Sequence, residues 1–145
     1  MLKIFKVSQR GFTFLEIIAM IVVVGILAAI AASRINSTDT YAISSELDKV
    51  QSHLRYAQGR AIRTNSSWGI SFSSSNTYCL FQTNAANKKV IAGEDQNNII
   101  LSKLAITSAP QTITFDGFGS PGAADIIVST SGGNITVAAN TGFTP

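Results

Sequence analysis

The feature that most constrains this chain is an apolar run from Phe12 to Ala32, twenty-one residues in which Glu16 is the only charged residue. As a helix that rises about 1.5 Å per residue, this run would extend about 31 Å, enough to cross the hydrocarbon core of a bilayer. A carboxylate inside such a helix is costly unless it reaches the interface or finds a partner. Glu16 therefore needs a functional explanation.

Three kinds of N-terminal segment fit the run. The first is a signal peptide, with a basic region at residues 1–10 and Ala29-Ile30-Ala31 as a small-x-small cleavage site. The second is a plain membrane anchor, and the third is a leader that is cut between Gly11 and Phe12. Only the third explains Glu16, because the new amine of Phe12 and the carboxylate can neutralise each other, and a pair costs less in hydrocarbon than two separate charges.

The order of residue types around the cut also points to the third interpretation. Basic residues, a glycine and an apolar helix with an early glutamate follow one another as Lys3, Lys6, Arg10, Gly11, Phe12, Thr13, Leu15 and Glu16. This segment resembles the class III leader of type IV pilins and pseudopilins. The resemblance implies that a prepilin peptidase cuts after Gly11 and N-methylates Phe12, and that Glu16 meets the amine of Phe12 on an adjacent subunit and sets the register of assembly.

The same resemblance implies partners and a location. The partners are prepilin peptidase, other pilins or pseudopilins, and the inner-membrane assembly platform. Lys3, Lys6 and Arg10 would keep the leader in the cytoplasm by the positive-inside rule. The apolar helix would first cross the bacterial inner membrane and later pack in a filament, with the remainder of the chain in the periplasm or on the filament.

The net charge of +3 does not indicate a nucleic-acid partner. The three basic residues of the leader, taken from a total of eleven, leave eight, which equals the eight acidic residues. The single cysteine, Cys79, excludes an intrachain disulfide. Because Cys79 lies in an alternating, strand-like run, we expect it to be buried as a small apolar residue, with an intermolecular disulfide as the alternative.

The chain after the apolar run divides into a helical part and a β part. A stripe at spacings of three and four residues predicts an amphipathic helix through Ile43, Leu47, Val50, Leu54, Ala57 and Ala61. Beyond Asn65 the apolar period becomes two. The expected strands are Trp68–Phe72, Thr77–Gln82, Lys89–Ile91, Ile99–Leu101, Thr112–Phe115, Asp125–Ser129 and Asn134–Ala138, with a tight hairpin at Gly132-Gly133.

These patterns predict an α+β, pilin-like fold, a long N-terminal helix packed on a C-terminal antiparallel β-sheet domain. We divide the chain into a cleaved leader (1–11), a transmembrane or filament-core helix (12–33), the amphipathic second half of that helix (34–65) and the β domain (66–145). The run from Leu54 to Arg63, followed by a short strand, resembles minor pilins and pseudopilins of the GspH/FimT class. That resemblance implies a minor subunit of a pilus or of a type II secretion pseudopilus.

Alternative functions are a major type IV pilin, a DNA-uptake minor pilin, and a secreted or anchored binding domain. Three arginines cluster near a helix C-terminus, where cations complement the helix dipole: Arg55, Arg60 and Arg63. The alternative role for these arginines is contact with DNA. Phosphate binding would want a wider basic patch, and the strands from Ile126 onward contain no Arg or Lys, so we expect no nucleic-acid binding.

We expect no enzyme, cofactor or metal site. His53 is the single histidine, and we expect it on the helix surface. The run from Gly117 to Gly122 matches G-x-G-x-x-G, but it leads into another strand-like run, so we interpret it as a loop between strands.

Overall fold

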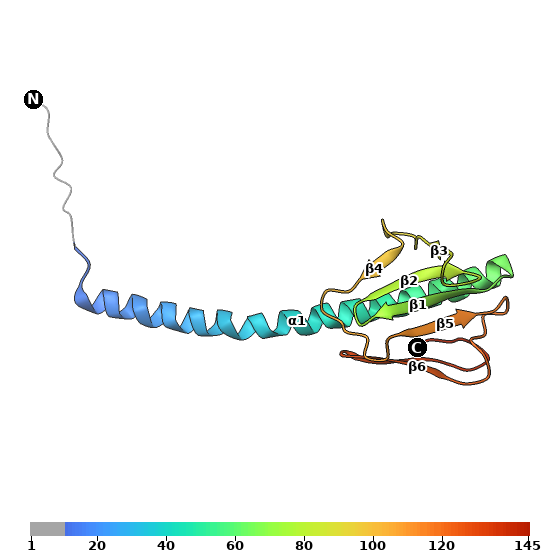
Figure 1. Cartoon of the computed structure of the whole chain (residues 1–145). Coiled ribbons are helices and arrows are strands. Elements are labelled where there is room, and N and C mark those ends of the chain that lie inside the picture. Colours follow the sequence, from blue (N-terminus) through green and yellow to red (C-terminus); the bar gives the residue numbers. More distant parts are fainter. Residues whose placement is uncertain (1–10) are drawn as a thin grey trace, which may run out of the picture. The chain divides into compact units, whose positions relative to one another are not determined.

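The computed structural model describes residues 11–145, without the side chains of residues 33–38. Within this range the chain forms helix α1, Phe14–Thr64, and seven strands (Figure 1). The chain divides after Thr38 into two compact units, so the first part of α1 belongs to one unit and the last part to the other.

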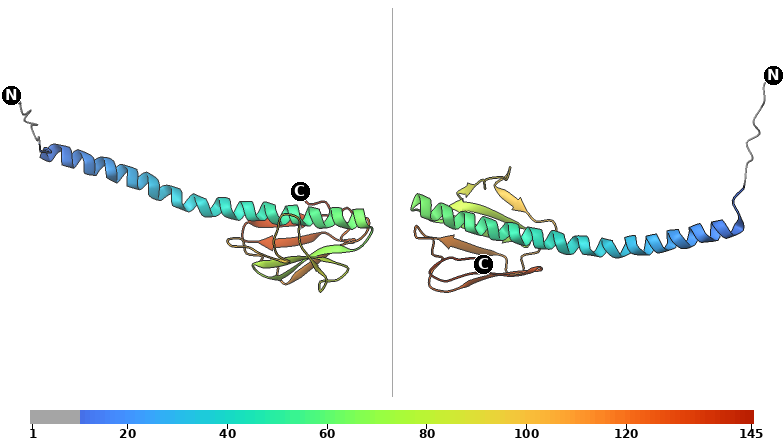
Figure 2. Two further views of the ribbon diagram at one scale, coloured as in Figure 1. Left: turned by 90° about the horizontal axis from the view of Figure 1, so that it is seen from above. Right: turned by 180° about the vertical axis from the view of Figure 1, so that it is seen from behind.

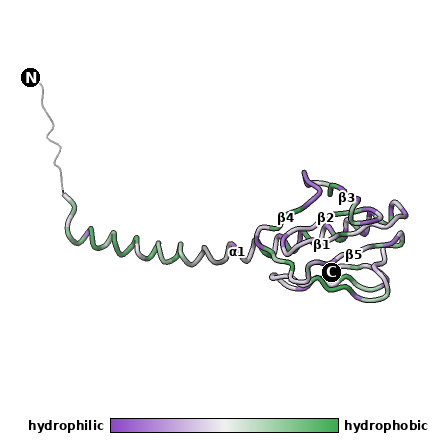
Figure 3. Tube along the Cα trace, viewed as in Figure 1, coloured by the Kyte–Doolittle hydropathy of each residue, from purple (hydrophilic) through white to green (hydrophobic). Residues whose placement is uncertain are grey.

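The first unit contains the apolar part of α1. The segment Phe14–Ala32 has a mean hydropathy of 2.8 and is long and apolar enough to cross a membrane. Its side chains are exposed along their whole length, and the hydrophobic colour follows this part of the helix in Figure 3. It contains no proline, so no intrahelical hydrogen bond is lost to a missing N–H.

In the second unit, the predicted stripe of α1 faces the core. Val50, Leu54, Ala57 and Ala61 are fully buried, and Ile43 and Leu47 pack against them while partly exposed. The prediction of an amphipathic helix over this region is therefore confirmed, and Figure 2 shows the strands gathered beside it.

A Schellman motif ends α1. Asn65 has a left-handed backbone with φ 45°. Its N–H donates to the carbonyl of Ile62 at 3.4 Å, and the N–H of Ser66 donates to that of Ala61 at 3.3 Å. These are the two bonds of this helix end, with asparagine in the place that glycine usually takes. The turn sends the chain directly into the first strand.

Five antiparallel strands form the main sheet, in the order β3-β2-β1-β5 with β4 also paired to β2. The central pair is β1 (Trp68–Ser74) and β2 (Thr77–Gln82), and β5 (Gln111–Phe115) pairs with the other side of β1. Two short strands, β3 (Lys88–Lys89) and β4 (Asn98–Ile100), share the outer edge of β2. Each of them begins one residue before the strand that the sequence predicts.

A separate hairpin forms a second sheet. Strand β6 (Ile126–Thr130) pairs with β7 (Gly133–Val137), and Thr130 lies opposite Gly133. Ser131 and Gly132 therefore connect the strands, so the predicted tight hairpin is present, with its turn one residue before the expected Gly132-Gly133. The β part thus consists of two antiparallel sheets rather than one, and the prediction of an α+β fold with antiparallel strands is confirmed. The run from Gly117 to Gly122 is a loop between β5 and β6, also as predicted.

The main sheet packs one face against α1 and buries part of the other. Tyr78 and Leu80 on β2 belong to the core beneath α1. Cys79 and Phe81 alternate with them, so they point to the opposite face, where both are nevertheless buried. Cys79 is free and only 3% exposed, which confirms its expected burial.

Gly69 on β1 allows the ring of Phe81 to lie across the sheet, and we predict that Gly69→Ala destabilises the fold. A Cβ at Gly69 would overlap the Ile113 carbonyl oxygen and the Phe81 ring, so we expect a loss of about 1–3 kcal/mol. Gly59, on the helix, has open space at its Cβ, so Gly59→Ala should stabilise by about 0.5–1 kcal/mol.

Urea unfolding of the full chain in mild detergent, followed by the fluorescence of Trp68, measures both changes. Trp68 is the single tryptophan and is buried. Equal effects of the two substitutions would show that the close approach at Gly69 does not matter.

Candidate functional site

The first unit holds the residues that the leader resemblance singles out. Gly11, Phe12 and Thr13 precede α1 in non-helical backbone, and Phe12 is 71% exposed. Glu16 lies in the first turn of α1, where the helix dipole favours a negative charge. The predicted leader charges Lys3, Lys6 and Arg10 lie outside the described residues.

Glu16 continues an apolar stripe of α1. It lines a shallow hollow of about 280 Å³ together with Ala19, Met20, Val23 and Val24. These residues follow Glu16 at three, four, seven and eight positions, so they share one helix face. A carboxylate thus sits at the N-terminal end of a face that is otherwise apolar and uncovered.

In the second unit, Glu46 joins α1 to the loop that follows β4. Its two carboxylate oxygens accept hydrogen bonds from the backbone N–H groups of Ser102, Lys103 and Leu104, at 2.9, 3.0 and 2.7 Å. Burial alone would raise the pKa of Glu46, but these three bonds and the charge of Lys49 lower it below its usual value. Glu46 therefore remains ionised and holds the loop against the helix.

His53 lies in a polar network beneath the loop that precedes β4. It is 8% exposed, so the prediction that it lies on the helix surface is wrong. His53 Nδ1 and the Tyr78 hydroxyl form a hydrogen bond of 2.8 Å, and His53 Nε2 lies 3.8 Å from the Glu94 carboxylate. The same carboxylate pairs with Lys49 at 2.5 Å.

The spacing of the stripe could have revealed this burial. His53 follows Val50 by three residues and precedes Ala57 by four, so it belongs to the same helix face. Because the stripe was defined by apolar residues, the polar His53 was not counted as part of it. Tyr78, on β2, supplies a hydrogen-bond partner that offsets the cost of removing the imidazole from water.

Burial sets the protonation of this network. Desolvation lowers the pKa of His53; the carboxylate of Glu94 opposes this shift, and Lys49 adds to it. Burial also raises the pKa of Tyr78, and the carboxylates of Glu94 and Glu46 reinforce that shift. Both side chains are therefore neutral near pH 7, and the network can act as a structural link between helix, sheet and loop.

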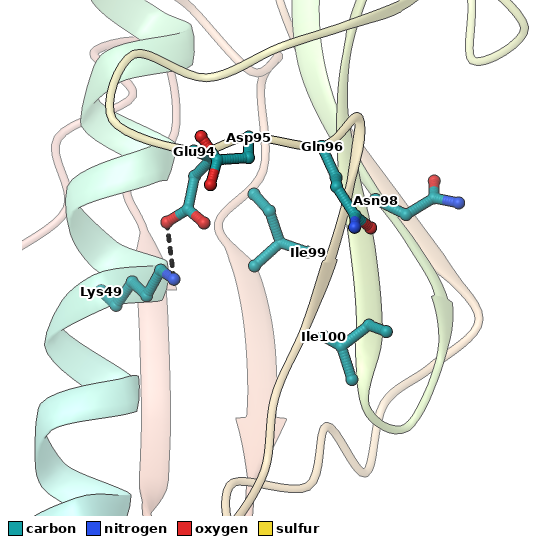
Figure 4. A pocket seen from close by; sticks show the side chains of 7 residues that line it. All are labelled: Lys49, Glu94, Asp95, Gln96, Asn98, Ile99 and Ile100. Atoms are coloured by element: carbon teal, nitrogen blue, oxygen red, sulfur yellow. Dashed lines mark ion pairs between the residues drawn. The ribbon is translucent and has the colours of Figure 1, made fainter.

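A polar pocket of about 250 Å³ lies beside the Lys49–Glu94 pair. Figure 4 shows its lining, which α1, the loop before β4, and β4 supply: Lys49, Glu94, Asp95, Gln96, Asn98, Ile99 and Ile100. Within residues 11–145, no three His, Cys, Asp or Glu side chains lie together in a way that could hold a metal ion.

The three arginines considered for DNA contact have separate surroundings. Arg55 Nε donates to the carbonyl of Thr144 at 3.0 Å. The guanidinium of Arg60 lies over the ring of Trp68, 4.9 Å from its centroid, in a cation–π contact. Arg63 is exposed in the last turn of α1. Two of the three guanidinium groups are thus engaged within the domain.

We predict that the chain loses stability as the pH falls from 7.0 to 5.5. The folded-state pKa of His53 lies below the ordinary value of 6.5, so the unfolded chain takes up the proton first and acid favours unfolding. The urea midpoint should therefore be lower at pH 5.5, and His53→Gln should remove most of this difference. Because the chain has one histidine, an unchanged difference in the variant would refute this assignment.

Glu46→Gln should cost about 1–2 kcal/mol at pH 7, because an amide oxygen replaces a charged acceptor of three N–H bonds. The lowered pKa of Glu46 means that its contribution is full above about pH 4.5 and is lost as the pH falls through the folded-state value. The gap between wild type and variant should therefore close in acid. Asp48→Asn, an exposed acid-to-amide change on the same helix, is the matched control and should have little effect.

One comparison with known proteins identifies the family. A family model described as type II transport protein GspH matches residues 46–144, more than half of the chain. No curated protein and no solved structure matches the chain significantly. The match begins at Glu46, which holds the loop after β4, and ends at Thr144, which accepts the bond from Arg55. The chain therefore belongs to the GspH family of type II transport proteins.

Proposed function

We propose that the chain is a minor pseudopilin or pilin, a non-enzymatic structural subunit that is cut between Gly11 and Phe12, N-methylated on Phe12 and assembled through α1. The observation that carries this proposal is the uncovered apolar face of α1 with a single carboxylate at its N-terminal end. Membership of the GspH family supports a type II secretion pseudopilus as the assembly. A type IV pilus is the related alternative.

An uncovered helix of this kind needs an apolar environment. In water it would expose a continuous hydrophobic surface, which soluble monomers avoid. A bilayer covers it before assembly, and the helices of neighbouring subunits cover it afterwards. The inner-membrane platform would move the subunit from the first environment to the second, with the globular domain on the periplasmic side.

Glu16 would fix the axial register between neighbouring α1 helices in the filament. Once the peptide bond after Gly11 is cut, Phe12 carries an ammonium group four residues before Glu16. N-methylation keeps that charge. Both charges are costly in an apolar core unless they pair, so a neighbouring helix is held where its Phe12 amine meets the Glu16 carboxylate. A shift along the helix would leave both charges without partners.

A DNA-uptake function receives less support from the site. Arg55 holds the C-terminal segment and Arg60 stacks on Trp68, so both have roles inside the domain. Arg55 and Arg63 are both exposed, but Arg55 already donates to the Thr144 carbonyl and Arg63 lies apart in the last turn of α1. A phosphate-binding surface would need more cations than this.

Replacement of Glu16 tests the proposed register directly. Glu16→Ala and the nearly isosteric Glu16→Gln should leave the peptidase product intact but reduce the amount of subunit in sheared filaments by about tenfold or more, because either change leaves the Phe12 ammonium unpaired. Quantitative immunoblotting of the cell and filament fractions measures both steps.

The glutamine variant separates charge from shape. Full assembly of Glu16→Gln would refute pairing as the source of register, even if Glu16→Ala failed. If neither variant were cleaved, Glu16 would be needed for processing, and its proposed role in assembly alone would be refuted.

A further inference from the structure

Thr13 occupies a distinct position between the proposed cut and the helix. Its carbonyl accepts the first helical hydrogen bonds, from the N–H groups of Glu16 at 3.0 Å and Ile17 at 3.2 Å. Its side-chain Oγ1 also accepts from the N–H of Glu16, at 3.2 Å. This is the geometry of an N-cap, whose side chain satisfies the N–H three residues later.

The surrounding residues have the spacing of a full helix-start signal. Thr13 and Glu16 match the T-x-x-E capping box, and the structure contains its threonine-to-N3 half. Phe12 and Ile17 stand at the two positions of a hydrophobic staple, directly before the N-cap and four residues after it. An N-terminus in an apolar environment has particular need of such a cap, because no water satisfies its free N–H groups there.

We propose that Thr13 is a positioning residue for processing, because its cap fixes the start of α1 two residues after the peptide bond to be cut. This inference rests on the proposed cleavage between Gly11 and Phe12. Cleavage adds the oxygen of water to the Gly11 carbonyl carbon, breaks the bond to the Phe12 nitrogen, and leaves a carboxylate on Gly11 and an ammonium on Phe12. A peptidase must therefore reach a Gly11 carbonyl that is free of helical hydrogen bonds.

Without the Thr13 hydroxyl, the nearest upstream residue that can start the helix is Gly11, since glycine is an acceptable N-cap. The carbonyl of an N-cap accepts the first helical hydrogen bond. A helix that started at Gly11 would thus engage the carbonyl that the peptidase attacks. In the structure, Gly11 and Phe12 are exposed and non-helical, and the cap at Thr13 keeps them so.

The test compares variants of the full chain in detergent with purified prepilin peptidase, with the mature product measured by intact mass. Thr13→Val removes the hydroxyl and keeps the shape, and it should lower kcat/KM for cleavage about fivefold, the effect of a typical lost N-cap. Thr13→Ser and Thr13→Asn keep a capping group in different shapes and should restore cleavage. Thr114→Val, the same change at an exposed strand position, should have no effect.

A second readout follows the cap itself. Labelling with 15N-glutamate gives three backbone signals, from Glu16, Glu46 and Glu94, and amide exchange at Glu16 should accelerate only in Thr13→Val. Slower cleavage together with faster exchange at Glu16, both rescued by asparagine, supports the inference. Unchanged exchange or unchanged cleavage in Thr13→Val overturns it. Failure of Thr13→Asn to restore cleavage also overturns it, because the peptidase would then recognise the threonine side chain itself. Wild-type chain that is not cut after Gly11 would instead overturn the proposed function.

Discussion

The structure depends on one unbalanced surface, an apolar helix face without cover and with a single carboxylate at its start. The hydrophobic effect makes that surface unstable in water. A bilayer covers the side chains but supplies no neighbouring subunit to pair with Glu16. A bundle of like helices satisfies both requirements when each supplies one ammonium group and one carboxylate. Under the proposed function, the same feature would explain why the subunit needs a membrane at first and a filament later.

In the globular domain, apolar and polar contacts together anchor the C-terminal part of α1 to the strands and loops. The stripe from Val50 to Ala61 supplies the apolar contact. Polar contacts then fix the loops: Glu46 binds three backbone N–H groups, and Arg55 and Gln58 bind carbonyls of the C-terminal segment. The GspH family match covers this set of contacts.

Features set by local periodicity could be predicted from the sequence, and features set by distant contacts could not. The helical stripe, the central strands and the β6–β7 hairpin follow from periods of 3.6 and 2 and from glycine at the turn. Strand bounds were less accurate: β3 and β4 begin one residue before the predicted strands, and β6 and β7 are each offset by one residue. Lysine and asparagine in β3 and β4 give little apolar alternation from which to place those bounds. The partners of Glu46 and His53 come from segments far along the chain, so no local pattern could reveal them.

The measurement that tests the account most directly is the mature N-terminus of the chain, taken from native membranes and determined by mass spectrometry. The proposed function predicts N-methylated Phe12, with residues 1–11 removed. A mature start at Ala32 would show a secreted domain, and an intact Met1 in a host with active prepilin peptidase would show a simple membrane anchor. Either result would contradict the proposed pairing of Glu16 with the Phe12 amine.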